Sequence, residues 1–550
     1  MTAPEPHAMS GAAPEPAGVS GSWLERAARI SDLRLTLLVG AALFGLYAWP
    51  LLLVPVPPLQ DLPNHLATAH IVAHPDLFPE FAFNGLFKSN ALLTLWFYTV
   101  GRLGLYGAAR AFVALVLAAN ALALPMFVLR FAGRRALPVA MLFAWPLVHG
   151  FAVSMGFLNF AFAFALALML LTVLDRQREA PTIGRGVAIG LLAGAVWYAH
   201  PFPLAVVGAL VALHVATRAT MRERVASAVR LLLPLAPAGA LALLAAQHHL
   251  VKSEHSTAAS AAFLYLNPWE NLEHLWLDVS GALTRWGAAT AVPAILLPIL
   301  ALASPSRQPR PPRAFFSAAA LVCLGLAYAG LPTMMSNWNY LNCRLAPFLW
   351  LALLVRLPER LPRPLVALLA LSGLSFSLAL GVDYVRLDRD RAEFTAGMDA
   401  VPPRATLLSL VFNRSKTSHW VASLTHAWGY YTVEKDASAP LIFGVERTYP
   451  ITYRDFPPSK LIPPALDRFA ERNGTPADVC RRLGQPPDDA TCVAAWRDIW
   501  RGFWREAEPR FSHLLTWAMP AEARALVPPR YHRVYAAEEL EIYARDGSRN

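Results

Sequence analysis

Long apolar segments alternate with short polar segments along residues 35–382. A helix needs roughly 20 apolar residues to cross the hydrocarbon core of a bilayer, and about eleven segments approach that length. They are 35–56, 109–130, 136–150, 152–174, 186–199, 202–217, 230–250, 291–305, 315–332, 345–356 and 364–382. This pattern predicts an all-α polytopic membrane bundle with about eleven transmembrane helices.

Arginine clusters mark alternate loops between these segments, at 130–135, 176–185, 218–224, 307–313 and 356–363. Because basic residues concentrate in cytoplasmic loops, these loops and the N-terminus are expected in the cytoplasm. The alternation requires that 91–105 does not cross, and its mixed polar and aromatic residues favour a helix lying in the outer interface. We therefore expect a multi-pass protein of the bacterial inner (plasma) membrane, with Asp61, Lys88 and the chain after Val382 outside.

The two ends of the chain differ from the bundle. Residues 1–34 are rich in Ala, Pro, Gly and Ser and lack an apolar core, which is typical of a disordered cytoplasmic tail. In residues 383–550 short apolar strands such as 406–412 alternate with helical stretches, which predicts an extracytoplasmic α/β domain. The expected domains are thus 1–34, 35–382 and 383–550.

Composition and charge agree with a membrane protein. The chain is 56% hydrophobic and only 15% charged, whereas roughly a quarter of the residues of a soluble domain are charged. The net charge is +11, but the excess lies in the loops expected in the cytoplasm, where it would meet anionic membrane lipids. Nucleic acid is therefore not an expected partner.

The four cysteines predict one disulfide and no metal site. Cys480 and Cys492 flank a polar turn on the side expected to be oxidising, so a local disulfide is expected between them. No CxxC pair or histidine cluster with zinc spacing occurs, and no glycine-rich phosphate loop is present. We expect neither a metal nor another cofactor, and the missing loop argues against an ATP-driven pump.

The candidate chemistry begins in PPLQDLPNHLATAH, directly after the first apolar segment. Asp61 lies there, Lys88 follows in the same loop, and Arg344 stands at the outer end of a late segment. One carboxylate and two cations suit transfer from an anionic lipid phosphate, with Asp61 as general base and the two cations on the phosphate. The alternative is that Asp61 only caps the helix that follows it.

Four more polar or aromatic residues are candidates for substrate binding: His65, His200, Trp338 and Asn339. The first could share the site of Asp61, and the last two suit sugar stacking and hydrogen bonding beside Arg344. Alternatives remain open, because an interfacial Trp often belongs to the aromatic belt and a His before a Pro often ends a helix. Three acids of the loop 251–290 are reserve bases: Glu254, Glu270 and Glu273.

The order of these motifs carries a resemblance over roughly residues 30–380. A first span is followed by Asp-x-Pro, by a Lys before a Leu/Trp/Tyr-rich helix, and by GAARAFVALVLAAN with a closing Gly-Arg-Arg. This order resembles the GT-C superfamily of membrane glycosyltransferases, of the protein O-mannosyltransferase and lipid A aminoarabinose transferase type. It is also similar to a group of bacterial membrane proteins with a QDLPNH motif and a GFLN stretch, here residues 156–159.

The resemblance implies a polyprenyl-phosphate sugar donor, an inverting mechanism and a site on the outer leaflet, with a glycan, lipid or protein as acceptor. Asp61 would be the catalytic carboxylate, and Lys88 and Arg344 would bind the donor phosphate. The chain departs from the family, because Leu62 stands where a second acid is usual and the turn 149–154 carries no acid. These departures argue against metal dependence and keep two alternatives open: a non-catalytic component of cell-envelope polysaccharide assembly, or a secondary transporter.

Overall fold

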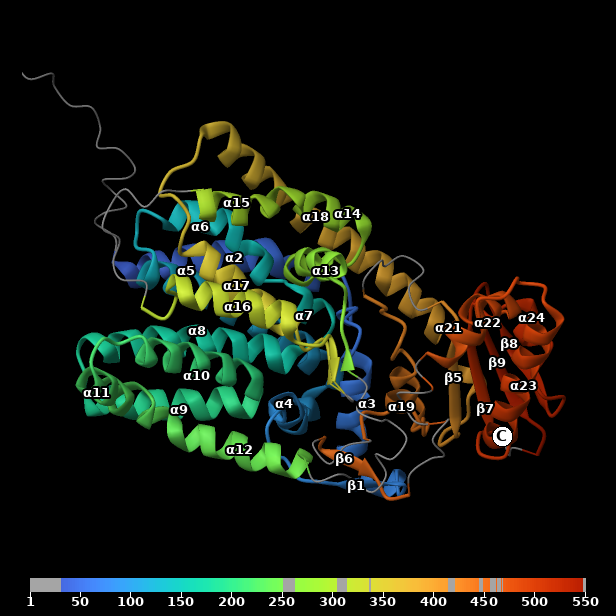
Figure 1. The fold of residues 1–550 in the computed structure, drawn as a ribbon. Coiled ribbons are helices and arrows are strands. Elements are labelled where there is room, and N and C mark those ends of the chain that lie inside the picture. Colours follow the sequence, from blue (N-terminus) through green and yellow to red (C-terminus); the bar gives the residue numbers. More distant parts are fainter. Residues whose placement is uncertain are drawn as a thin grey trace, which may run out of the picture.

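The structure is a computed structural model and describes residues 31–250, 263–303, 314–335, 338–413, 421–444, 449–455, 461, 466 and 468–547. It consists of a helical bundle and, beyond one end of that bundle, a smaller part that contains a sheet (Figure 1). The bundle therefore has one end near this smaller part and one end remote from it.

The helices of the bundle are α2 Asp32–Ala48, α3 Leu62–Ala73, α4 Leu92–Val100, α5 Leu105–Phe131, α6 Leu137–Ala144, α7 Phe151–Ser154, α8 Leu158–Glu179, α9 Ile183–Ala199, α10 Pro201–Ala216, α11 Met221–Leu231, α12 Ala236–Leu250, α13 Pro268–Ser280, α14 Arg285–Ala291, α15 Leu296–Ala303, α16 Ala318–Gly330, α17 Ala346–Leu354 and α18 Arg363–Thr395. The helices that follow are α19 Gly429–Lys435, α21 Phe469–Asn473, α22 Pro476–Arg482, α23 Ala490–Ala507 and α24 Ala521–Arg524. The strands are β1 Phe81–Phe83, β2 Phe263–Leu264, β3 Met334–Met335, β4 Trp338–Asn339, β5 Leu407–Val411, β6 Ile451–Tyr453, β7 His513–Trp517, β8 Tyr531–Ala536 and β9 Leu540–Arg545.

Seven helical segments of the described chain are long and apolar enough to cross a membrane. They are Asp32–Leu52, Leu105–Phe131, Leu137–Ser154, Leu158–Glu179, Met221–Leu244, Arg285–Ala303 and Arg363–Ala400. Four shorter apolar helices accompany them: Ile183–Ala199, Pro201–Ala216, Ala318–Gly330 and Cys343–Leu354. The protein is thus a helical multi-pass membrane protein, and each apolar segment expected from the sequence overlaps one of these helices.

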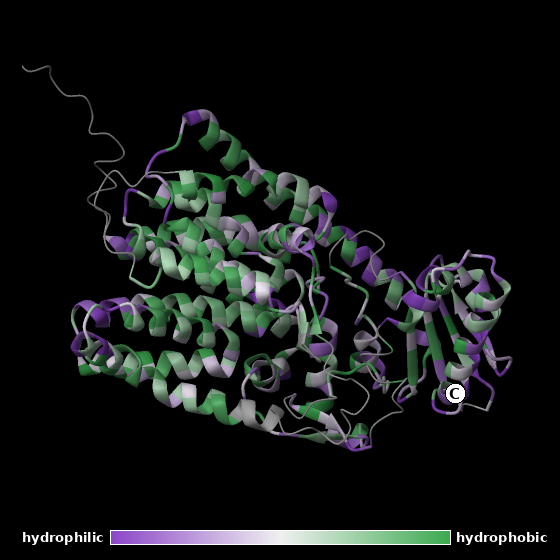
Figure 2. Ribbon diagram, in the orientation of Figure 1, coloured by the Kyte–Doolittle hydropathy of each residue, from purple (hydrophilic) through white to green (hydrophobic). Residues whose placement is uncertain are grey.

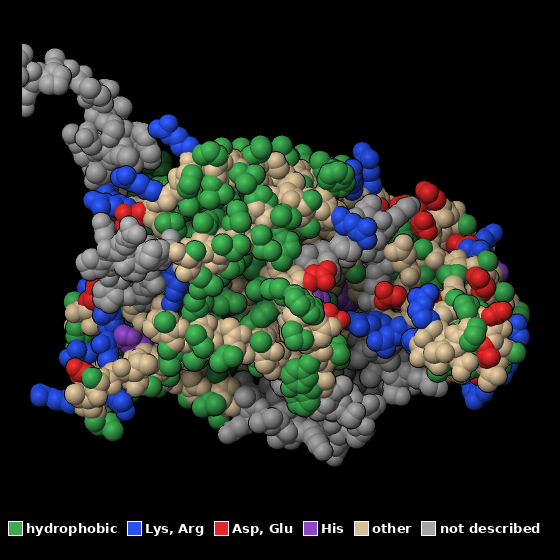
Figure 3. Space-filling model, turned by 45° about the horizontal axis from the view of Figure 1, so that its top comes forward, with side chains coloured by type: hydrophobic (Ala, Val, Ile, Leu, Met, Phe, Trp, Pro, Cys, Tyr) green, Lys and Arg blue, Asp and Glu red, His purple; other side chains and the backbone are tan. Residues whose placement is uncertain are grey.

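The centre of the bundle is a row of helices in which α2 packs on α5, α5 on α8 and α8 on α9 (Figure 1). Close approach needs small residues: a Cβ on Gly40 of α2 would lie 2.6 Å from Leu122 Cδ2 of α5. Leucines on the outer helices, such as Leu191, Leu326 and Leu378, remain exposed. Figures 2 and 3 show the result, an apolar flank with charged side chains gathered toward both ends of the molecule.

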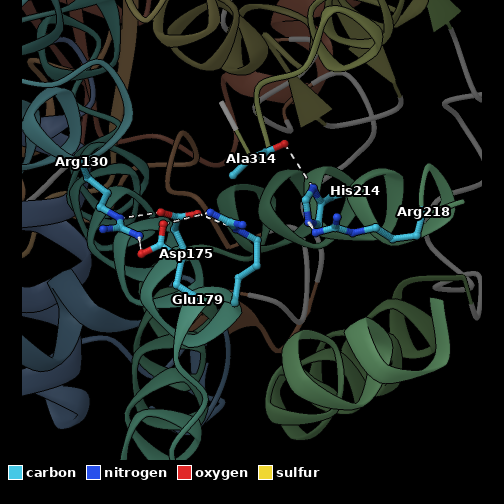
Figure 4. Close-up of polar contacts among 7 residues, drawn as sticks. Arg130, Asp175, Glu179, His214, Arg218 and Ala314 are labelled. Atoms are coloured by element: carbon cyan, nitrogen blue, oxygen red, sulfur yellow. Dashed lines mark hydrogen bonds and ion pairs between the residues drawn. The ribbon is translucent and has the colours of Figure 1, made fainter. Parts of the chain in front are cut away.

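The remote end of the bundle holds a charged network (Figure 4). Arg130 of α5 donates to Asp175 of α8 and pairs with Glu179, and Arg178 Nε donates to Asp175 Oδ1 over 2.9 Å. Close by, Arg218 Nη2 donates to His214 Nε2 over 2.8 Å. These basic residues belong to the loops expected in the cytoplasm, and ion pairing lowers the cost of burying the carboxylate of Asp175, which is 3% exposed.

The small C-terminal sheet has the strand order β5-β7-β9-β8, with β5 and β7 parallel and the other pairs antiparallel. One face packs on α23, whose Trp496, Trp500 and Trp504 recur at helical spacing and are buried. The other face packs toward the bundle, where the rings of Trp517 and Phe394 are 5.5 Å apart. Because both faces are covered, all five residues of β5 are buried, and its sequence LLSLV is apolar on both faces except at Ser409.

A disulfide joins α22 to α23. It links Cys480 and Cys492, whose Cα atoms are 5.4 Å apart. The bond closes a short loop beside the three tryptophans, and in the chain-entropy model a loop of this size contributes about 3 kcal/mol.

Two features of the chain after the last apolar segment were not expected. First, α18 does not end at Val382 but continues to Thr395, and so reaches the C-terminal sheet. Second, residues 421–444 and 449–455, called the returning chain below, come back to the near end of the bundle: α19 packs on α3, and β6 pairs antiparallel with β1. Parts of the chain expected in a separate domain therefore contact the loop that follows the first span (Figure 1).

Candidate functional site

Asp61 lies at the near end of the bundle, one residue before α3, and is only 8% exposed. Its backbone N–H donates to Met155 O over 3.0 Å, and its backbone oxygen accepts from His65 N–H. The side chain makes no capping hydrogen bond to α3. Instead, Gln60 Nε2 and His426 Nε2 each lie 3.5 Å from Asp61 Oδ1. The geometry therefore does not support the alternative in which the carboxylate serves only as a helix cap.

The GFLN segment, 156–159, fixes the position of Asp61. Gly156 has φ +83°, and a Cβ there would lie 2.9 Å from Asp61 N and 3.1 Å from Asp61 Cβ. Only glycine adopts this conformation and this close approach without strain. The same turn separates α7 from α8, which is why α8 begins at Leu158 and not near 152 as the apolar pattern predicts.

Two further residues of this segment, Phe157 and Asn159, contact Arg344 and the loop that carries Lys88. The Phe157 ring lies beneath the Arg344 guanidinium, with the centroid 5.1 Å from Cζ. Asn159 Oδ1 accepts from Leu93 N–H over 2.8 Å, and Asn159 Nδ2 donates to Asn90 O over 2.8 Å. Asn159 thus holds the start of α4 and the end of the loop that carries Lys88.

Arg344 lies in the turn Cys343–Leu345 that opens α17. Its Nη1 donates to His200 Nε2 over 2.6 Å, and no carboxylate of the described residues contacts its guanidinium. The guanidinium is partly buried, and the Asp61 carboxylate is close enough to stabilise its positive charge. A charged guanidinium with so few partners can bind an anion by donating its remaining N–H groups.

His200 is the hydrogen-bond acceptor that holds Arg344. It stands between α9 and α10, where its Nδ1 lies 3.2 Å from Phe202 N. A neutral imidazole has one acceptor nitrogen, so the ring accepts either from Arg344 or from Phe202 N–H, which would cap α10, and not from both at once. Burial, and after it the charge of Arg344, holds the pKa of His200 well below 6.5. His200 is therefore neutral near pH 7, and it combines the helix-end role with a contact to the candidate site.

Lys88 lies between β1 and α4 and is half-buried. Its Nζ donates to Tyr449 O over 3.2 Å, and Asn84 Nδ2 donates to the same oxygen over 3.2 Å. Burial lowers the pKa of the Lys88 ammonium.

The remaining candidates are only partly placed at the site. The ring of His65 lies edge-on to Phe443, with centroids 6.0 Å apart, and burial lowers the pKa of His65 to about 4. It is a neutral group at pH 7. Trp338 and Asn339 form β4, but their side chains lie outside the described part of the structure.

The reserve acids have other roles or no described position. Glu270 and Glu273 are on α13 and are exposed, and Glu270 Oε2 accepts from Asn267 N–H over 3.0 Å. Glu254 lies outside the described residues. Among the residues that the structure does describe, no cluster of three or more His, Cys, Asp or Glu side chains could hold a metal ion.

Sequence reasoning did not anticipate the contribution of the returning chain. Gln60 Oε1 accepts from Ala422 N–H over 2.9 Å, and Asn64 Nδ2 donates to Leu441 O over 3.0 Å. Gly429 packs on this turn so closely that a Cβ would lie 2.4 Å from Pro63 O. The QDLPN residues thus hold the returning chain and bring His426 to Asp61. The sequence feature that could have indicated this contribution is the aromatic segment THAWGYY, which contains His426 and Gly429.

The structure therefore gathers Asp61, Lys88, Arg344 and His200 at one end of the bundle, together with His426 and Tyr449 of the returning chain. These residues bring one carboxylate, two cations and two imidazoles together in a largely buried setting. In comparisons with known proteins, no family model matches the sequence and no curated protein matches it.

Proposed function

We propose that the protein is a membrane glycosyltransferase that moves a sugar from a polyprenyl-phosphate donor to an acceptor at the membrane surface. The acceptor is a glycan, a lipid or a protein. The observation that carries the proposal is the GFLN segment, which contacts Asp61 through Gly156, Arg344 through Phe157 and the loop of Lys88 through Asn159. Three of the four residues of this segment thus contact Asp61, Arg344 and the loop that carries Lys88, which supports a shared site for the carboxylate and the two cations.

The chemistry follows from these groups. The Asp61 carboxylate takes the proton of an acceptor hydroxyl while the hydroxyl oxygen attacks the anomeric carbon of the sugar. The bond between that carbon and the phosphate oxygen breaks, and the lipid phosphate leaves with the electron pair. Arg344 and Lys88 stabilise the negative charge that the phosphate gains. Attack from the side opposite the leaving group inverts the anomeric configuration.

The proposal includes a GT-C-like bundle of about eleven crossings, formed by the seven long helices and the four shorter apolar ones. The short helices require local thinning of the bilayer or burial among neighbours, at a modest cost. An odd number of crossings puts the two ends of the chain on opposite sides of the membrane. In the proposed orientation the N-terminus lies in the cytoplasm and the C-terminal part outside. The Arg-rich loops at the remote end of the bundle support this orientation.

Reporter fusions test this orientation in the bacterial inner membrane. A fusion at residue 75, just after α3, and a fusion at the C-terminus should both report the outer side. A fusion at residue 180, next to Glu179 of the charged network, should report the cytoplasm. A cytoplasmic signal from the C-terminus together with an outer signal from residue 75 would contradict the proposed topology.

Activity is tested with purified protein in proteoliposomes that contain a polyprenyl-phosphate sugar with a radiolabelled sugar. The expected result is label transferred to an acceptor supplied as envelope glycan, lipid or peptide, together with release of polyprenyl phosphate. A non-catalytic assembly component would bind the lipid but release none of it. A transporter would move a solute across the liposome without forming a glycosidic bond. Either result would overturn the proposal.

A further inference from the structure

His426 is a side chain of the returning chain that lies next to Asp61. The two meet with His426 Nε2 3.5 Å from Asp61 Oδ1. The imidazole is 4% exposed, and its ring lies edge-on to Phe443, with centroids 4.9 Å apart. A buried imidazole beside a buried carboxylate is a costly arrangement unless the two groups interact.

The backbone on both sides holds this contact in place. His426 O accepts from Gly429 N–H over 2.9 Å, which closes the turn before α19. Gly429 then lies against Pro63 O, and Phe443 N–H donates to Asn64 Oδ1 over 3.2 Å. Pro63 and Asn64, the second and third residues after Asp61, therefore support the turn that carries His426.

We propose that His426 is a positioning residue for Asp61, so that the described residues 421–444 and 449–455 complete the site formed by the bundle. The proposal rests on the function proposed above, since it assigns His426 a part in the same transfer. Neutral His426 donates its Nε2–H to Asp61 Oδ1 and orients the carboxylate toward the acceptor hydroxyl. Protonated His426 places a positive charge beside Asp61, which stabilises the carboxylate and makes it a weaker base.

This assignment predicts a pH dependence with a definite sign. As the pH falls and His426 gains its proton, Asp61 becomes a weaker base, so transfer should decline on the acid side. Three other titratable or charged groups lie near the pair: His65 and Tyr449, whose rings contact the same Phe443 ring as His426, and Arg344, whose guanidinium is close enough for the Asp61 charge to act on it. His65, with its pKa near 4, stays neutral above about pH 5.

The test compares two substitutions of His426. His426→Gln keeps an N–H donor and should retain transfer within a few-fold of wild type near pH 7, but the decline on the acid side should move to lower pH. His426→Ala removes the donor and should lower transfer by roughly 10²-fold at every pH, the cost of a misplaced catalytic group. A purely structural histidine would give neither the moved pH profile nor the rescue by Gln.

His70→Gln is the matched control. His70 of α3 pairs with Asp436 of the returning chain, with Nε2 2.8 Å from Oδ1. In this pair the His comes from the bundle and the Asp from the returning chain, the reverse of Asp61 and His426, and neither residue forms a hydrogen bond or an ion pair with Asp61. The substitution should leave the pH profile of transfer unchanged, and a change equal to that of His426→Gln would overturn the proposal.

A second measurement does not depend on transfer. Histidine side chains labelled with nitrogen-15 can be titrated by NMR in lipid nanodiscs, and His426 is assigned from the signal lost in His426→Gln. Asp61→Asn should make this signal titrate at lower pH, because the imidazolium loses its neighbouring carboxylate. An unchanged titration would overturn the inference, whereas a changed titration in a protein without any transfer would support the contact and contradict the proposed function.

Discussion

Asp61→Asn should lower glycosyl transfer by roughly 10²–10⁴-fold, the contribution of a general base. Asn has nearly the same shape as Asp and can still contact Gln60 and His426, but its amide cannot take a proton. Binding of the donor should change little, because Arg344 and Lys88 still carry the charges that meet the phosphate. The measurement is transfer from a polyprenyl-phosphate sugar in proteoliposomes, with donor affinity determined separately.

Asp76→Asn is the control for this substitution. Asp76 follows α3 in the same loop and is exposed, so its replacement should leave transfer at the wild-type rate. Wild-type transfer by Asp61→Asn would show that Asp61 is not the base. The base would then be sought among the acids of residues 251–290, beginning with Glu270 and Glu273 of α13.

The bundle could be predicted because its helices follow from the local apolar pattern alone. Each long segment is apolar over enough residues to be recognised without knowledge of its neighbours. The prediction of a helical membrane protein with a C-terminal part that contains strands is confirmed. What hydropathy does not reveal is where a helix ends beyond the apolar segment. After Val382 the sequence DYVRLDRDRAEF is charged, yet α18 continues, with Tyr384, Leu387 and Phe394 buried along one side.

The candidate site was predictable only in part, because some of its residues come together through long-range contacts that no local pattern reveals. Asp61, Lys88 and Arg344 are uncommon charges next to apolar segments, so the sequence alone singles them out. His426 and Tyr449 contribute through contacts that span more than 350 positions of the chain, and no local pattern encodes such pairs. His200 shows the intermediate case, because Pro201 predicts its helix-end role, while its bond to Arg344 depends on how α10 packs beside α17.

Arg344→Ala should weaken binding of the lipid phosphate by roughly 10- to 100-fold. A hydrogen bond to a charged group contributes about 1.5–3 kcal/mol, and each 1.4 kcal/mol is a tenfold change in affinity. The affinity of Arg344→Lys should lie between those of the wild type and Arg344→Ala, because Lys keeps the charge but lacks the planar pair of donors. Binding of the matching polyprenol, which has no phosphate, should be the same in all three proteins when measured by native mass spectrometry.

Arg102→Ala is the matched control, since Arg102 is exposed and lies over the ring of Tyr98, on the side of the bundle proposed to be outside. It should bind the lipid phosphate as wild type does. Equal affinity of wild type and Arg344→Ala would remove Arg344 from the phosphate site and leave its bond to His200 as a packing contact.

Lys88 should contribute less than Arg344 near pH 7 and should give the binding its pH dependence. Lys88 is only half-buried, and its Nζ already donates to Tyr449 O, so Lys88→Ala should weaken lipid-phosphate binding by less than Arg344→Ala does. Burial lowers the pKa of its ammonium, so the charge is present at lower pH and is lost as the pH rises through that lowered value. Affinity of the wild type for polyprenyl phosphate should therefore decline toward alkaline pH. Lys88→Arg, which keeps its charge throughout, should abolish the decline, and an unchanged decline in that variant would assign the pH dependence to another group, such as Tyr449.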